Sequence, residues 1–268
     1  MEYDMSDLFR TARLFAGTLP LSFTDLGRGR TFLLLHGGAG PASLIGVATA
    51  LANDHNRVVL PTHPGFNGAF RPEWFSSVAD LVAAYLSLID HLELSDVMVV
   101  GHSFGGWIAA ELALRNSPRM TAAVLMNAVG IDTGSEDKVI VNPMDLEPAE
   151  RVKLAFHNKA FAVAPSTPEA MVMMRSNYET LKAYADRPFM FDPAFRQRLA
   201  GMTKPVLVAW GESDGIVDLA YGRRYADSVP GSIFKPVAEA GHNPHIEKPD
   251  VVLGLINEFL DGVARDGA

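Results

Sequence analysis

The sequence predicts an α/β fold with a mostly parallel central sheet, helices on both faces and an inserted helical segment. Short apolar runs rich in strand-forming residues alternate with helical patterns, and each run ends in a loop that carries glycine or a polar residue. Such continuous runs between helices indicate parallel strands buried on both faces. This alternation of strands and helices is interrupted over residues 131–202, where several helix-start signals follow one another without a strand-like run.

The elements follow in order along the chain. Residues 77–92 place apolar side chains at helical spacing, and Ser77 with Asp80 resembles a capping box. Further helices are expected at residues 104–114 and from Pro249 onward, where proline suits the first helical turn. The predicted strands are 32–35, 57–60, 97–100, 120–126, 206–210 and 233–237, preceded by a hairpin within residues 11–26.

Residues 1–130 and 203–268 are therefore expected to form the core, with residues 131–202 as a helical cap. Thr167 and Pro168 give an N-cap and a first-turn proline to the main helix of this cap. A further short helix opens after Asp192. Large apolar residues of the cap are candidates to line a pocket: Phe156, Phe161, Met171, Met173, Met174, Phe189 and Phe191.

Composition limits the function classes. The 268 residues are 48% hydrophobic and can bury a large core, and the formal charge of −8 gives no basic stripe for nucleic acid or an anionic membrane. A small, largely apolar molecule is the expected partner. The chain has no cysteine, no apolar run long enough to span a bilayer and no visible secretory signal, so a cytoplasmic location is expected. Whether it forms a homo-oligomer is left open.

A serine stands between glycines where a predicted strand turns into a helix. Residues 101–106 read G-H-S-F-G-G and directly follow the apolar run 97–100. A sharp turn of this kind exposes the serine hydroxyl, and the glycines let the neighbouring backbone pass closely. The pattern predicts Ser103 as a nucleophile.

The loop after the strand at residues 32–35 is rich in glycine and reads H-G-G-A-G at residues 36–40. Glycine there lets backbone N–H groups converge on an anion without obstruction by side chains. A merely flexible turn is the alternative interpretation. We expect the N–H groups of Gly38 and Phe104 to form an oxyanion hole, with Ala39 as the alternative to Gly38.

An acid and a base are expected in the loops after later strands. Asp214 follows the strand at 206–210, and His242 follows the strand at 233–237. The order serine, aspartate, histidine along the chain is that of a known triad arrangement. Other candidates are Asp132, Glu212 and Asp218 for the acid and His245 for the base.

Together these motifs resemble those of the α/β-hydrolase fold family. The family's HG-type oxyanion loop, G-x-S-x-G elbow, G-x-x-D acid and late G-H base are matched by residues 37–38, Ser103, Asp214 and His242. The resemblance covers nearly the whole chain outside the cap and implies a serine hydrolase. Residues 247–249 resemble the lead into the family's last helix, and no catalytic role follows from that likeness.

The nucleophile narrows the chemistry, because fold alone does not choose a reaction. Ser103 implies acyl transfer, so hydrolysis of an ester, lactone, thioester or amide is the first hypothesis. Similar capped families hydrolyse carbon–carbon bonds of diketone-type ring-cleavage products, but usually have an aromatic residue where this chain has Asn243. A perhydrolase or lyase with the same triad and a ligand sensor with slow turnover are further alternatives. No paired histidines stand at ligand spacing, so neither a metal nor a cofactor is expected.

Overall fold

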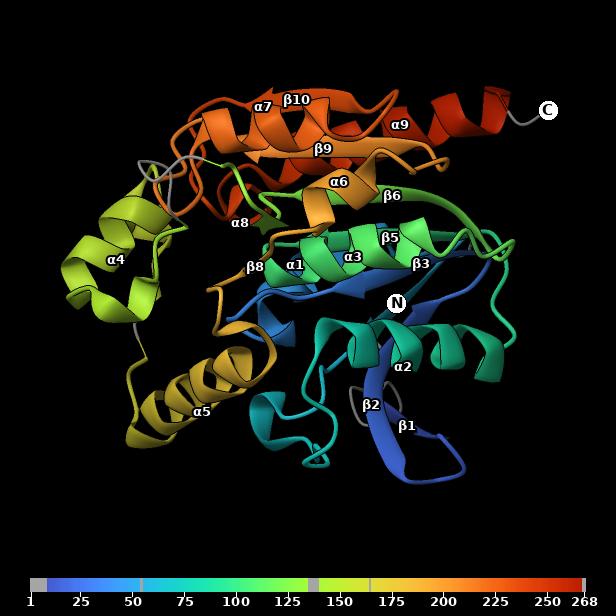
Figure 1. Ribbon diagram of the computed structural model, residues 1–268, viewed down its shortest axis with the longest axis horizontal. Helices are drawn as coiled ribbons and strands as arrows, with labels where there is room; N and C mark the ends of the chain where they lie inside the picture. Colours follow the sequence, from blue (N-terminus) through green and yellow to red (C-terminus); the bar gives the residue numbers. More distant parts are fainter. Residues whose placement is uncertain (1–8, 54, 135–139, 164, 267–268) are drawn as a thin grey trace.

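An eight-stranded sheet in the order β1-β2-β4-β3-β5-β6-β9-β10 forms the centre of the protein (Figure 1). The computed structural model describes residues 9–53, 55–134, 140–163 and 165–266. Strands β1 and β2 form the predicted hairpin, and β2 also pairs with β4 in antiparallel fashion, while the remaining neighbours are parallel. The strands are β1 Phe9–Leu14, β2 Leu19–Gly27, β3 Arg30–Leu35, β4 Asn56–Pro61, β5 Val97–His102, β6 Met120–Met126, β9 Val206–Gly211 and β10 Ile233–Val237.

Helices cover both faces of this sheet (Figure 1). One face carries α2 (Val78–His91), α3 (Phe104–Leu114), α6 (Phe195–Leu199) and α7 (Leu219–Asp227). The other carries α1 (Ile45–Leu51) and α9 (Pro249–Asp266). The predicted α/β fold is confirmed. Among the described residues, no helix is long and apolar enough to cross a membrane.

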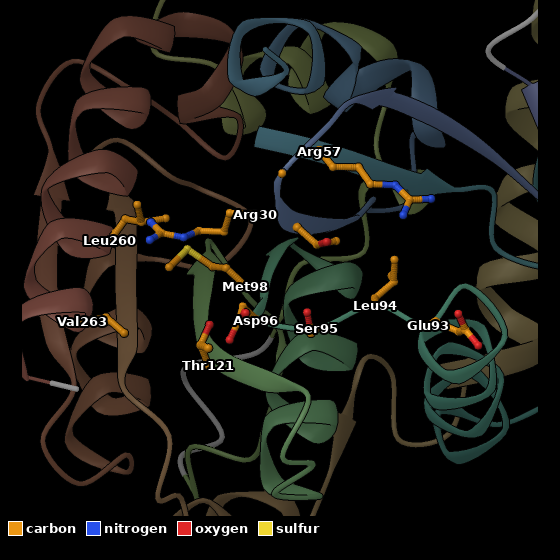
Figure 2. Close-up of a pocket in the computed structure, with 12 residues that line it drawn as sticks. Arg30, Arg57, Glu93, Leu94, Ser95, Asp96, Met98, Thr121, Leu260 and Val263 are labelled. Carbon is orange, nitrogen blue, oxygen red and sulfur yellow. The ribbon is translucent and has the colours of Figure 1, made fainter. Parts of the chain in front are cut away.

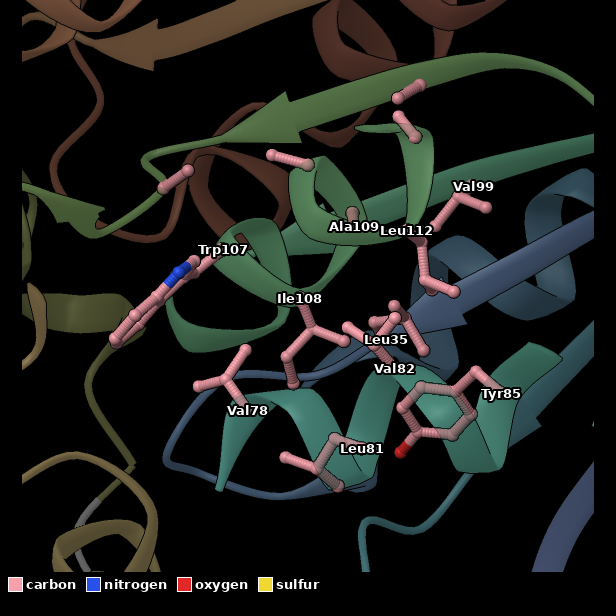
Figure 3. Packing of buried hydrophobic residues seen from close by; sticks show 14 of the residues in the cluster. Leu35, Val78, Leu81, Val82, Tyr85, Val99, Trp107, Ile108, Ala109 and Leu112 are labelled. Carbon is pink, nitrogen blue, oxygen red and sulfur yellow. The ribbon is translucent and has the colours of Figure 1, made fainter. Parts of the chain in front are cut away.

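The core on the first face is built around α2 and α3. Figure 3 shows Leu81 and Tyr85 of α2 beside Ile108 of α3, and all three side chains are buried. The predicted capping box holds the start of α2, because Ser77 Oγ accepts the N–H of Asp80 at 3.2 Å while Asp80 Oδ2 accepts the N–H of Ser77 at 2.9 Å. This packing fixes α3, and with it the turn that carries Ser103.

Part of the segment between β6 and β9 packs against the core. Its end returns to the core: α6 packs against α3, with Phe195 fully buried and Arg198 paired to Glu111 at 2.6 Å. A short strand pair, β7 (Gly130–Ile131) with β8 (Phe191–Asp192), also joins the two ends of the segment. This pair could not be predicted from the sequence, because two-residue strands carry no periodicity.

Two helices of this segment lie beyond the carboxyl ends of the strands (Figure 1). They are α4 (Pro148–Ala155) and α5 (Pro168–Ala185), accompanied by the short 3₁₀ turns η4 (Pro143–Asp145) and η5 (Lys159–Phe161). None of the α4 residues is buried. The helix is therefore only partly covered, and hydrogen bonds at its end also attach it to the core.

Helix α5 docks through polar side chains. Tyr184 Oη donates to the carbonyl of Pro64 at 2.8 Å, Thr180 Oγ1 donates to the carbonyl of Gly65 at 3.0 Å, and Asn177 pairs with Asn67. These partners lie in the loop after β4, next to η3 (Phe66–Gly68). The first turns of α5 remain exposed, and they include Met171, which was a candidate to line the pocket.

Candidate active site

Ser103 occupies the turn between β5 and α3. Its backbone is strained, with φ 55° and ψ −117°, a region that residues other than glycine rarely adopt. The flanking glycines are required by close contacts. A Cβ on Gly101 would lie 2.2 Å from the carbonyl oxygen of Gly105, and one on Gly105 would lie 2.0 Å from that of Leu35. The G-x-S-x-G pattern thus reflects backbone packing that no side chain would permit.

The structure brings Ser103, His242 and Asp214 into one hydrogen-bonded chain. His242 Nε2 lies 3.0 Å from Ser103 Oγ, and His242 Nδ1 lies 2.8 Å from Asp214 Oδ2. All three residues are largely buried. A carboxylate at Nδ1 fixes the tautomer whose Nε2 can accept the serine proton.

Asp214 is held rigidly by the loop that follows β9. Its Oδ1 accepts the N–H groups of Ile216 at 2.8 Å and Val217 at 3.1 Å. Its Oδ2 also accepts Asn127 Nδ2 at 2.6 Å, so Asn127, which follows β6, contacts the triad directly. Asparagine at a strand end is a weak sequence signal, and only the fold shows its partner.

The other candidate acids have different surroundings from Asp214. Asp218 caps α7 by accepting the N–H of Tyr221 at 2.7 Å. Asp132 accepts the N–H of Gly134 at 2.8 Å, and Glu212 is exposed. His242, rather than His245, is the histidine that reaches Ser103 Oγ.

Glycines allow the acid and base loops to approach one another. A Cβ on Gly211 would lie 1.9 Å from the carbonyl oxygen of Gly241. Gly211, which opens the G-x-x-D motif, is therefore required by the contact between the end of β9 and the loop after β10. A Cβ on Gly241, which precedes His242, would instead lie 2.6 Å from the carbonyl oxygen of Ala155.

The predicted oxyanion loop lies beside Ser103. Gly38 and Ala39 line the same cavity as Ser103 and His242. Phe104 is the first residue of α3, where helix geometry supplies no acceptor for its N–H. A Cβ on Gly37 would lie 3.0 Å from that of Ser103, which shows how closely this loop passes the serine.

A pair of buried histidines anchors the oxyanion loop to the loop after β4. His63 donates its backbone N–H to His36 Nε2 at 3.0 Å, and His63 Nε2 donates to the carbonyl of His36 at 2.8 Å. Tyr85 Oη contacts the remaining nitrogen, His63 Nδ1. Burial lowers the pKa of His36 to about 4 and that of His63 well below its usual value, so both rings are neutral and structural.

A second histidine cluster surrounds the base. His102 Nε2 donates to the carbonyl of His242 at 2.8 Å, and the rings of His102 and His245 are 4.4 Å apart. Burial, with a further contribution from His245, lowers the pKa of His102 well below its usual value. Burial, with a further contribution from His242, lowers the pKa of His245 to about 3. These neutral rings shape the elbow without competing for the serine proton.

The cavity above Ser103 has a volume of about 230 Å³ and is mostly apolar. Of the cap residues expected to line it, Met174 and Phe189 do so, and the other candidates do not. Its polar lining residues beyond the loops described above are Arg151, Tyr178 and Asn243. Further apolar lining comes from Val129, Ile140, Val141, Met144, Leu181, Met190 and Ile216.

A larger hollow of about 580 Å³ lies at the opposite, amino-terminal ends of the strands (Figure 2). Arg30, Arg57 and Thr121 are among its lining residues, none of which is a histidine. Its acidic and hydroxyl side chains, Glu93, Asp96, Ser95 and Thr121, include no serine–histidine–aspartate chain like the one that lines the smaller cavity. Within the described ranges, no group of three or more histidine or carboxylate side chains could hold a metal ion.

Comparisons with known proteins agree with this fold. A family model described as the alpha/beta hydrolase family matches residues 32–255. A 2-hydroxy-6-oxononadienedioate/2-hydroxy-6-oxononatrienedioate hydrolase from Pseudomonas putida is 30% identical, over 94% of this chain and 96% of the relative. A 2-hydroxy-6-oxo-2,4-heptadienoate hydrolase from Pseudomonas putida F1 is 28% identical, over 92% of this chain and 95% of the relative. The crystal structure of a meta-cleavage product hydrolase from Pseudomonas fluorescens IP01 has a TM-score of 0.77 at 23% identity, covering 96% of this chain and 99% of that one.

Proposed function

The chain belongs to the alpha/beta hydrolase family, and from this premise we propose that it hydrolyses a carbon–carbon bond beside a ketone in a small unsaturated carboxylate. The observation that carries the proposal is the 3.0 Å contact between Ser103 Oγ and His242 Nε2, with Asp214 behind the histidine. In this proposal residues 131–202 act as a cap that closes the substrate cavity. Of the hypotheses that the sequence raised, the comparisons favour carbon–carbon cleavage over ester hydrolysis.

The proposed chemistry follows from the triad. Ser103 Oγ attacks the ketone carbon while its proton passes to His242 Nε2, and the N–H groups of Gly38 and Phe104 stabilise the oxyanion. Collapse of the oxyanion breaks the bond to the adjacent carbon. For a 2-hydroxy-6-oxo-2,4-dienoate this requires prior ketonisation, in which the 2-hydroxyl loses its proton and carbon 5 gains one and becomes tetrahedral. The electron pair then enters the conjugated 2-oxo system of the leaving half, which takes up the proton from His242. Water, deprotonated by His242, then hydrolyses the acyl-Ser103 ester and releases a carboxylic acid.

Arg151 supports a carboxylate-bearing substrate. It is the one cationic side chain among the described residues that line the cavity. Its Nε donates to the carbonyl of Pro143 at 2.9 Å and its Nη2 to that of Leu146 at 3.3 Å. Within the part of the chain that the structure describes, Nη1 meets only the sulfur of Met174, at 3.8 Å. A guanidinium has five N–H donors, so these contacts leave donors for a substrate carboxylate. The substrates named for the relatives are carboxylates with a ketone at carbon 6.

Ester hydrolysis is the second candidate, and Asn243 favours it. This side chain lines the cavity directly after the base, and its Nδ2 lies 3.4 Å from the carbonyl of Ala155. Similar carbon–carbon hydrolases usually carry an aromatic residue at this place, which would offer a stacking surface to a planar diene. The polar side chain of Asn243 offers no such stacking surface, but it is compatible with the flexible acyl chain of an ester.

The test compares two substrates on the same enzyme. Consumption of 2-hydroxy-6-oxo-2,4-heptadienoate is followed by loss of its absorbance, and 4-nitrophenyl butyrate reports ester cleavage. We expect a higher kcat/KM with the dienoate and loss of both activities in Ser103→Ala. Turnover of the ester alone would replace the proposal by its second candidate. Dienoate turnover that survives Ser103→Ala would refute the serine as nucleophile.

A further inference from the structure

The base loop between β10 and α8 (Pro244–Glu247) contains no regular structure that would fix His242 by itself. Its backbone is instead held by partners from separate parts of the fold. The carbonyl of His242 accepts His102 Nε2 at 2.8 Å, and the N–H of His242 donates to the carbonyl of Ala155 at 2.9 Å. The position of the catalytic ring therefore depends on contacts made outside the triad.

Glu247 supplies the charged contact in this set. It is only 5% exposed, and both of its carboxylate oxygens accept backbone N–H groups. Oε2 accepts the N–H of Gly241 at 2.6 Å, directly before the base. Oε1 accepts the N–H of Asn158 at 2.8 Å, in the segment that follows α4. A single buried carboxylate thus joins the base loop to the cap, through hydrogen bonds of the strong, charge-assisted kind.

The end of α4 touches the acid loop as well. The N–H of Gly215 donates to the carbonyl of Leu154 at 2.9 Å, and His157 Nδ1 lies 2.8 Å from Ser213 Oγ. Side chains are excluded from these contacts: a Cβ on Gly215 would lie 2.8 Å from Leu154, and one on Gly241 would lie 2.6 Å from the carbonyl oxygen of Ala155. Because no residue of α4 is fully buried, these hydrogen bonds contribute much of what holds its end in place.

We propose that Glu247 is a positioning residue that couples the cap to the catalytic base. It holds Gly241 and Asn158 at a fixed separation, so that movement of the end of α4 is transmitted to His242. This inference rests on the proposed role of His242 as the base. It adds a function for the cap beyond covering the substrate, since the segment 154–158 becomes part of the support of the triad.

The test replaces Glu247 by glutamine, which keeps the shape but can accept only one of the two N–H groups. Glu111→Gln is the matched control, because Glu111 is similarly buried and also uses both carboxylate oxygens, here in its pair with Arg198. The measurements are kcat and KM, the rate at which a fluorophosphonate labels Ser103, and amide hydrogen exchange of residues 155–161. The melting temperature of each variant is recorded in parallel.

We expect Glu247→Gln to lower kcat and the labelling rate by about tenfold to a hundredfold, as for a misplaced catalytic group, while KM changes by less than about threefold. Exchange at residues 155–161 should accelerate. Glu111→Gln should lower the melting temperature without lowering the labelling rate. Glu247→Asp, which is too short to span both N–H groups, should behave like the glutamine variant.

Labelling and turnover at the wild-type rate in Glu247→Gln would overturn the proposal, as would an equal loss of rate in Glu111→Gln. Failure of both Glu247 variants to fold would show a structural role and would also overturn it. The proposed function is judged separately: a wild-type enzyme that is labelled at Ser103 but ignores the dienoate has another substrate, and the labelling comparison still decides the role of Glu247. Absence of labelling in the wild type would refute the triad itself.

Discussion

Acid should destabilise this protein steeply because its core contains neutral histidines. His36 and His245 are buried, and their pKa values are lowered to about 4 and about 3. In the unfolded chain both rings titrate near 6.5. Between pH 6.5 and these lower values the unfolded state binds protons that the folded state does not, so stability falls as the pH falls.

The magnitude follows from the two titrations. For one ring the unfolded state gains about 2 kcal/mol from protonation at pH 5, against about 0.2 kcal/mol at pH 7, while the folded state gains almost nothing. His36 and His245 together should therefore remove about 4 kcal/mol between pH 7 and pH 5. The lowered pKa values of His63 and His102 add loss in the same direction. A domain with a stability of about 5 to 15 kcal/mol would lose a large share of it.

Urea unfolding at pH 7, 6 and 5, followed by circular dichroism, measures this loss. We expect the urea concentration at the midpoint to fall while the dependence of the free energy of unfolding on urea concentration stays constant. The variant His245→Leu isolates one contribution. Neither ring nitrogen of His245 has a hydrogen-bond partner of ordinary geometry among the described residues, so leucine removes the titrating group without breaking such a bond. The variant should lose about 2 kcal/mol less than the wild type between pH 7 and pH 5. His91→Gln, at an exposed histidine, is the control.

A wild type that loses less than about 2 kcal/mol over this range would refute the reasoning, because the lowered pKa of His36 or of His245 alone requires that much. An unchanged pH dependence in His245→Leu would refute the part assigned to His245. A change of equal size in His91→Gln would show that the effect does not come from burial.

Three further predictions concern the site and its scaffold. Asn127→Leu removes the 2.6 Å hydrogen bond to Asp214 and should lower kcat by about tenfold or more with little change in KM; steady-state kinetics within twofold of the wild type would contradict it. Arg151→Met should raise KM for the dienoate by about tenfold or more and change 4-nitrophenyl butyrate kinetics by less than about threefold; equal effects on both substrates would remove Arg151 from carboxylate binding. Gly254→Ala fills open space on α9 and should raise the free energy of unfolding by about 0.5 to 1 kcal/mol, and a lower melting temperature would contradict that.

The parts of the fold that the sequence predicted are those where local chemistry and tertiary structure agree. The strands 97–100 and 206–210 have the apolar character that burial on both faces demands, and the capping box of Ser77 and Asp80 forms as expected. Helix α5 shows where this agreement ends. Met171 was a candidate to line the pocket, but it is exposed. Instead α5 lies on the backbone of a loop, whose carbonyl groups Thr180 and Tyr184 satisfy.

The same distinction explains which parts of the site could be predicted from the sequence. Close approach of two backbones requires glycine, so the contact between the end of β9 and the loop after β10 is marked in the sequence by Gly211. The contact between α4 and the loop of His242 uses the carbonyl of Ala155, a group that nearly any residue would provide. Its trace in the sequence is Gly241, because a Cβ there would lie 2.6 Å from the carbonyl oxygen of Ala155. The glycine before His242 therefore indicates close packing, and only the structure shows that the neighbouring element is the end of α4.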